Sequence, residues 1–179
     1  MSSFDVDLWK KRAWERFARR ARAIDPLDEV SKSKAEKRWF SDVNSVKDIE
    51  SVVSWCESFK VSVEFVRRVG GLCDSAAKTI RVSSALSPTN QLVVLLHECG
   101  HFLMNDVKGD RSDMGWSKAD DPVFSRTFEH RVACIDEELE AWHRGWKLSR
   151  RLGLRVTRAT FNAVKLDCVR TYVKWATRK

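Results

Sequence analysis

The chain has 179 residues, a formal net charge of +8, an apolar fraction of 43% and eight tryptophans. This length fits one domain with a core of its own, and the apolar fraction excludes an intrinsically disordered chain. No stretch approaches the roughly 18 uncharged apolar residues of a membrane span, and the N-terminus lacks the apolar run of a secretory signal. The five cysteines form no C-x-x-C pair, which is typical of a reducing compartment, so we expect a cytoplasmic protein.

The charge is distributed unevenly along the chain. Residues 1–40 carry a net charge of +4, residues 41–146 carry −5, and residues 147–179 carry +9. Basic ends favour an anionic partner, most often nucleic acid. The alternative is that these charges are ordinary solvated helix faces. A further alternative is a basic amphipathic helix near the N-terminus that binds a partner protein or a membrane surface.

The first part of the chain predicts helices. Apolar residues four apart indicate a helix over residues 4–23, which Asp25-Pro26 ends. A second, short helix is expected over residues 28–40. Ser45 is suited to cap a third helix, whose apolar face runs to Phe59.

The periodicity then changes to that of strands. Apolar residues alternate with polar ones over residues 61–65, and residues 79–82 read as a second short strand. Ser87 followed by Pro88 predicts the start of a helix, because serine is a good cap and proline fits the first helical position. We expect this very apolar helix to continue to Met104.

The last part of the chain is again helical. Residues 105–121 read as a polar loop, and a long helix is expected from there to about Leu152, stopped by Gly153. Thr157 is suited to cap a final basic helix. Helices, a small sheet and further helices in that order predict an α+β fold.

The segment that carries chemistry is His97-Glu98-Cys99-Gly100-His101, an H-E-x-x-H motif within an apolar helix. On a helix, His97 and His101 lie on the same face and can bind one Zn²⁺ ion. Glu98 lies beside them, where its carboxylate can take a proton from an activated water. The alternative is a pair of core histidines bonded to local carbonyl groups.

A zinc site with a catalytic water needs a third protein ligand. On the long helix, a bulky apolar stripe runs through Phe128, Val132, Ile135, Leu139, Trp142 and Trp146. A second stripe beside it holds Glu138 among the small residues Cys134, Ala141 and Gly145, which let another helix approach closely. We therefore expect Glu138 to be the third ligand. His130, His143 and Glu137 are the alternatives.

These residues resemble the zincin metallopeptidases of the ImmA/IrrE family over roughly residues 59–150. His97-Glu98-Cys99-Gly100-His101 is similar to the family's H-E-x-G-H, and Glu138-Leu139-Glu140-Ala141 to its E-x-x-A. The family usually has Asn or Asp next, where this chain has Trp142. With the helices expected at both ends, the resemblance leads us to expect a zincin-like fold with N-terminal helices, a small mainly antiparallel sheet, a buried H-E-x-x-H helix and C-terminal helices. It also implies that residues 79–82 form an edge strand that pairs with an extended substrate.

We accordingly expect three parts: an N-terminal helical segment (1–58), a zincin-like metallopeptidase core (59–152) and a basic C-terminal helix (153–179). The expected function is a zinc metalloendopeptidase acting on a protein or peptide substrate, with zinc on His97, His101 and Glu138 and with Glu98 as general base. The oxyanion donor is left open among His130, His143, Tyr172 and Arg131. The alternative is a nucleic-acid-associated protein whose zinc site is structural or whose proteolysis acts on DNA-bound proteins.

Overall fold

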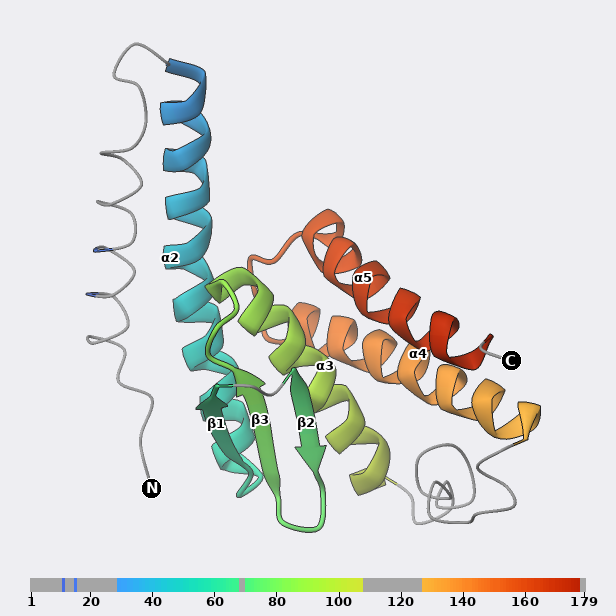
Figure 1. Ribbon diagram of the computed structural model, residues 1–179. Coiled ribbons are helices and arrows are strands. Elements are labelled where there is room, and N and C mark those ends of the chain that lie inside the picture. Colours follow the sequence, from blue (N-terminus) through green and yellow to red (C-terminus); the bar gives the residue numbers. More distant parts are fainter. Residues whose placement is uncertain (1–10, 12–14, 16–28, 68–69, 108–126, 178–179) are drawn as a thin grey trace.

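The computed structural model describes residues 11, 15, 29–67, 70–107 and 127–177. The elements follow in the order α2 (Glu29–Ser58), β1 (Ser62–Val66), β2 (Gly71–Asp74), β3 (Thr79–Ser83), α3 (Pro88–Val107), α4 (Phe128–Arg151) and α5 (Arg158–Ala176) (Figure 1). A small sheet flanked in sequence by helices confirms the α+β class. The helix predicted over residues 4–23 lies outside the described residues, apart from Lys11 and Glu15, and so does most of the predicted loop 105–121.

The sheet is mixed, not mainly antiparallel as predicted. Its strand order is β1-β3-β2, with β1 parallel and β2 antiparallel to β3. β1 and β3 run the same way. At the end of β3, backbone hydrogen bonds join it to the residues on both sides: the Ser84 N–H donates to the Val66 carbonyl and the Ser83 N–H donates to the Gly70 carbonyl. The expectation that residues 79–82 form an edge is therefore wrong, since β3 is the central strand.

α2 is one continuous helix of 30 residues, so the prediction of two helices separated near Ser45 is wrong. Ser45 does not cap a helix, because its hydroxyl donates to the Ser41 carbonyl one turn earlier, at 2.8 Å. Serine often makes this bond inside a helix, and no glycine or proline lies nearby to interrupt α2. The predicted apolar face does reach the core through Ile49 and Cys56, which are fully buried.

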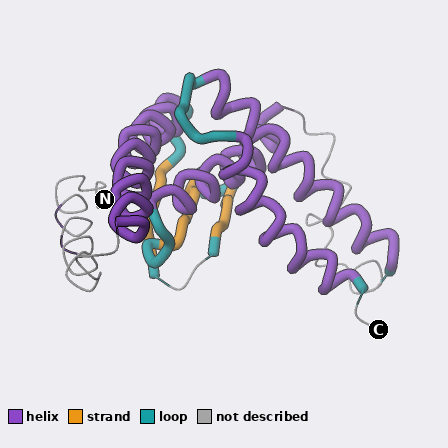
Figure 2. Tube along the Cα trace, turned by 90° about the horizontal axis from the view of Figure 1, so that it is seen from above, coloured by secondary structure: helices purple, strands orange, loops and turns teal. Residues whose placement is uncertain are grey.

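α3 is the central helix of the fold. Ser87 caps it as predicted, with its hydroxyl accepting from the Asn90 N–H at 3.3 Å. Residues 91–100 are all buried, and α3 contacts α2, α4, α5 and strands β2 and β3 (Figures 1 and 2). Among the described helices, none combines the length and apolar character that crossing a bilayer requires.

α3 and α4 pack unusually closely, through small residues. A β-carbon on Gly100 would overlap the Ala141 carbonyl, and one on Gly145 would overlap the Leu96 carbonyl. Leu96 of α3 thus faces Gly145 of α4, and Gly100, four residues later on α3, faces Ala141, four residues earlier on α4. The two helices therefore run antiparallel. Since the backbones meet here, the predicted small-residue stripe is the face of α4 that packs on α3.

The bulky stripe of α4 does not lie wholly in the core. Phe128, Val132 and Leu139 have 69%, 49% and 37% of their surface accessible, whereas Trp142 has 1%. Two bulky side chains cannot fit where the α3 and α4 backbones approach so closely, so the small side chains take the buried face.

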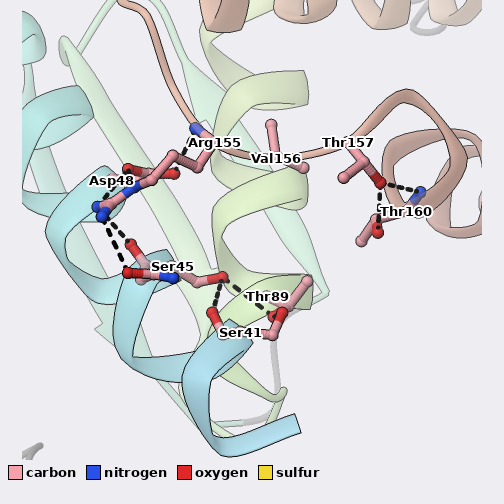
Figure 3. A pocket seen from close by; sticks show the side chains of 9 residues that line it. Ser41, Ser45, Asp48, Thr89, Arg155, Val156, Thr157 and Thr160 are labelled. Atoms are coloured by element: carbon pink, nitrogen blue, oxygen red, sulfur yellow. Dashed lines mark hydrogen bonds and ion pairs between the residues drawn. The ribbon is translucent and has the colours of Figure 1, made fainter. Parts of the chain in front are cut away.

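The C-terminal region is fastened to α2 by an ion pair. Asp48 is buried and accepts from the Arg155 backbone N–H at 2.9 Å and from its guanidinium at 2.9 and 3.2 Å (Figure 3). Next to it, Thr157 caps α5 as predicted, accepting from the Thr160 N–H. Phe161 of α5 joins the same apolar cluster as residues of α2 and α3. The division into parts at residues 58 and 152 stays a prediction.

Candidate metal centre

The structure brings His97, His101 and Glu138 together. Nε2 of His97 lies 3.1 Å from Glu138 Oε2, Nε2 of His101 lies 3.5 Å from Glu138 Oε1, and the two Nε2 atoms are 3.2 Å apart. The histidines are one turn apart on α3, and the glutamate comes from the facing stripe of α4. In the part of the chain that the structure describes, this is the one group of three metal-ligating side chains whose donor atoms converge.

The separations of these donor atoms fit a zinc ion. Ligand atoms about 2.0–2.1 Å from Zn²⁺ in tetrahedral geometry lie about 3.3–3.4 Å from one another. The three distances, between 3.1 and 3.5 Å, bracket that value. Two imidazoles and one carboxylate also form a donor set that zinc prefers.

The electrostatics of the group favour metal-binding protonation states for two of its members. Burial lowers the pKa of His97 and so favours a neutral ring. Burial alone would raise the pKa of Glu138, but hydrogen bonds from His101 and His97 bring it down to about 2. For His101, burial acts to lower the pKa, but Glu138 outweighs it and the pKa rises. An ion bound here would therefore displace a proton from His101.

Glu98 lies next to the group but faces the sheet. It is buried, and a β-carbon on Gly71, the first residue of β2, would overlap its carboxylate. Burial raises the pKa of the Glu98 carboxyl to about 7. A carboxyl of this kind can take up and release a proton near neutral pH, as a general base must. Gly71 was not singled out in the sequence, since its role depends on a strand that the sequence did not predict.

Trp142 covers one side of the histidine pair. Its ring stacks on His97 with 4.1 Å between centroids and 17° between planes, and Phe161 of α5 packs edge-on against it. In the sequence this tryptophan stood out as a member of the bulky apolar stripe and as a departure from the family pattern. The structure gives it a definite place, against the flat face of His97.

The other candidates lie elsewhere. His143 is exposed, and the buried His130 lies beside Cys134, with 3.5 Å between Nε2 and Sγ. Arg131 donates to the Ala176 carbonyl at the end of α5. None of these three belongs to the converging group. Of the oxyanion candidates, Tyr172 of α5 is the one whose pKa the Glu138 carboxylate affects: burial, and after it the Glu138 charge, raises the pKa of the Tyr172 hydroxyl.

A polar pocket of about 100 Å³ lies beside the Asp48–Arg155 pair (Figure 3). Its hydroxyl and charged groups bond to one another: Ser45 bonds Thr89, Thr157 bonds Thr160, and Arg155 donates to Asp48. Because these bonds tie α2, α3 and the start of α5 together, the pocket reads as a structural junction.

Residues 67–127 match the Peptidase M78 family model, the IrrE N-terminal-like domain. The resemblance seen in the sequence is confirmed. The matched segment holds the H-E-x-x-H motif and ends before Glu138, so it supports a metallopeptidase-family role without reaching the third side chain of the group. Comparisons with curated proteins and with solved structures gave no match. The nucleic-acid partner expected from the basic ends stays a prediction.

Proposed function

We propose that this protein is a zinc metalloendopeptidase that hydrolyses peptide bonds of a protein substrate. His97, His101 and Glu138 hold the ion, and Glu98 is the general base. The convergence of the three donor atoms, at distances that fit a tetrahedral zinc site, carries this proposal. The match of residues 67–127 to a peptidase family supports it.

The zinc ion, when bound, supplies a Lewis acid that activates water and polarises the substrate carbonyl. The chain's own residues do the rest. Glu98 takes the proton from the attacking water and later passes it to the leaving amine, a cycle suited to a carboxyl with a pKa of about 7. Trp142 and Phe161 close one side of the site and exclude water from the face of His97.

The substrate is bound along β2. This strand pairs with β3 on one side, and among the described strands nothing pairs with its other side. Its first residue, Gly71, lies against the Glu98 carboxylate. An extended peptide that adds to this edge by backbone hydrogen bonds would run past the general base. Such pairing tolerates many sequences, so the edge does not select the substrate by itself.

A Glu98→Gln variant tests the general base. It keeps the shape of the side chain and leaves all three metal ligands in place, so we expect wild-type zinc content and a loss of hydrolysis of at least about 100-fold. The assay follows new N-termini by mass spectrometry in a mixture of unfolded proteins. Glu64→Gln, an exposed glutamate on β1, is the control and should cleave like the wild type. Undiminished cleavage by Glu98→Gln would refute the proposed mechanism.

A further inference from the structure

Helices α3 and α4 share an aromatic stack at one of the proposed metal ligands. The Trp142 ring lies nearly parallel to the His97 imidazole, with 17° between the planes and 4.1 Å between the centroids. Both side chains are buried, with 6% of His97 and 1% of Trp142 exposed. Stacking with an offset is one of the arrangements that aromatic pairs prefer. The indole therefore covers one face of the imidazole.

The second nitrogen of His97 lacks the hydrogen bond that usually orients a metal-binding histidine. Nε2 of His97 faces Glu138 at 3.1 Å, and a neutral ring that binds an ion through Nε2 carries its proton on Nδ1. Such histidines almost always donate this proton to a carboxylate, a carbonyl or water. Within the described residues, no protein group partners the buried Nδ1 atom. Trp142 cannot accept the proton, because an indole only donates, and its own Nε1 has no partner there either.

Packing is what remains to set the plane of the imidazole. The last torsion of a histidine side chain has a broad, roughly twofold preference, so the helical backbone alone does not fix the ring. The plane decides where the Nε2 lone pair of His97 points. His101 meets this ring edge-on, with 75° between the planes and 4.6 Å between the centroids. Turning the imidazole out of its plane would drive its edge into the Trp142 ring, so the stack restricts this rotation.

Trp142 is itself held by α5. The Phe161 ring packs edge-on against it, with 83° between the planes and 5.5 Å between the centroids, and also contacts Trp146 at 5.2 Å. Phe161 is 1% exposed. Rings from three helices thus form one continuous chain that ends on His97. Trp142 and Phe161 both lie beyond residue 127, where the match to the peptidase family ends.

We propose that Trp142 is a positioning residue, whose indole ring fixes the plane of the His97 imidazole so that Nε2 points toward the bound ion. The stack acts in place of the hydrogen bond that Nδ1 of His97 does not make. This inference rests on the proposed function, since that function assigns His97 to zinc. Groups that orient a metal ligand typically change metal affinity about 10- to 100-fold, and we expect a single stacked ring to act at the lower end of that range.

The test measures zinc affinity by competition with a chromogenic chelator, and it needs no substrate. Trp142→Leu keeps an apolar side chain but removes the flat ring, and we expect zinc binding about tenfold weaker than in the wild type. Trp142→Phe keeps an aromatic face and should bind zinc within about threefold of the wild type. Melting of the metal-free proteins checks that the variants are folded. If Trp142→Leu does not melt cooperatively, Trp142→Met replaces it, because its flexible chain fills space without a flat face.

Trp146→Leu is the matched control. It makes the same substitution one turn later on α4, where the ring packs on Phe161 and lies under the guanidinium groups of Arg150 and Arg158. It removes aromatic packing from the same cluster without touching the His97 stack. We therefore expect a lower melting temperature with zinc affinity within about twofold of the wild type.

A cobalt spectrum separates positioning from a general loss of stability. Co²⁺ takes the place of Zn²⁺ in sites of this kind, and its visible absorption bands depend on the geometry of the ligands. At saturating Co²⁺, the bands of Trp142→Leu should differ from those of the wild type, and Trp142→Phe should restore them. The bands of Trp146→Leu should be unchanged. A role of Trp142 in stability alone would lower the melting temperature and leave the cobalt bands as they are.

Wild-type zinc affinity in Trp142→Leu, or equal losses in Trp142→Leu and Trp146→Leu, would overturn the inference. If the wild type binds zinc and His97→Ala does not, the proposed function survives either result. If the wild type binds no zinc, the proposed function fails and the inference fails with it.

Discussion

Replacing Gly145 by alanine tests the close packing of α3 on α4. In an ordinary helix this change would stabilise the protein by about 1 kcal/mol, because alanine has the higher helix propensity. Here the added β-carbon would lie 2.8 Å from the Leu96 carbonyl carbon and 3.2 Å from the His97 nitrogen. Ordinary contact begins at 3.4 Å, so the helices must separate by at least about 0.6 Å to clear this carbon, and by more to clear the carbonyl oxygen, which is nearer. Because the obstacle is backbone and cannot rotate away, overpacking should cost about 2–3 kcal/mol, at the upper end of its usual range, and outweigh the gain in propensity.

The same displacement acts on the proposed metal site. It moves the α3 backbone at His97 relative to the α4 stripe that holds Glu138, and 0.6 Å exceeds the roughly 0.2 Å that ligand distances tolerate. We expect a melting temperature lower by about 2–8 °C and zinc binding at least about tenfold weaker. Gly70→Ala is the matched control, since a β-carbon there meets nothing within 4 Å. A Gly145→Ala protein that melts at or above the wild type would refute the packing argument.

Three further changes probe other parts of the molecule. Asp48→Asn weakens the charged hydrogen bonds to the half-exposed Arg155, so the free energy of unfolding measured in urea should fall by about 1–2 kcal/mol. Glu64→Gln, which removes one partner of an exposed ion pair, should lower it by less than about 1 kcal/mol. Equal losses would contradict the structural role of Asp48. Thr157→Ala removes the cap of α5 and should cost about 0.5–2 kcal/mol in the same assay, and no loss would show that the cap contributes nothing. Chelation of zinc present at about 100 times its Kd should lower the melting temperature by about 5–11 °C, and an unchanged melt would mean that zinc does not bind the folded state.

The motif on α3 was predictable because it depends on local geometry alone. His97 and His101 share a face in any α-helix, and Ser87 and Pro88 mark where that helix begins. The end of α4 and the Thr157 cap of α5 were predictable for the same reason. Sequence patterns of this kind need no knowledge of what packs against the helix.

Features set by tertiary pairing were harder to predict. β2 has the sequence Gly-Leu-Cys-Asp, with no alternation of apolar and polar residues, and it is a strand because it pairs with β3. The break expected near Ser45 rested on a capping residue, but capping residues also occur inside helices, where they bond to the preceding turn. The place of Tyr172 depends on how α5 packs along α4, which no local pattern in the sequence encodes.

The prediction of Glu138 shows which sequence pattern on α4 indicates the face that packs against α3. The bulky stripe does not mark the buried face of α4, because Phe128 and Leu139 are exposed. Small residues pointed to the right one, because Gly100 on α3 meets Ala141 and Leu96 meets Gly145. A shift of one residue along α4 turns a side chain by about 100°, so only a glutamate within the small-residue stripe faces α3 squarely. In a helix pair packed this closely, the small side chains mark the interface, and a lone acid among them reaches the partner helix.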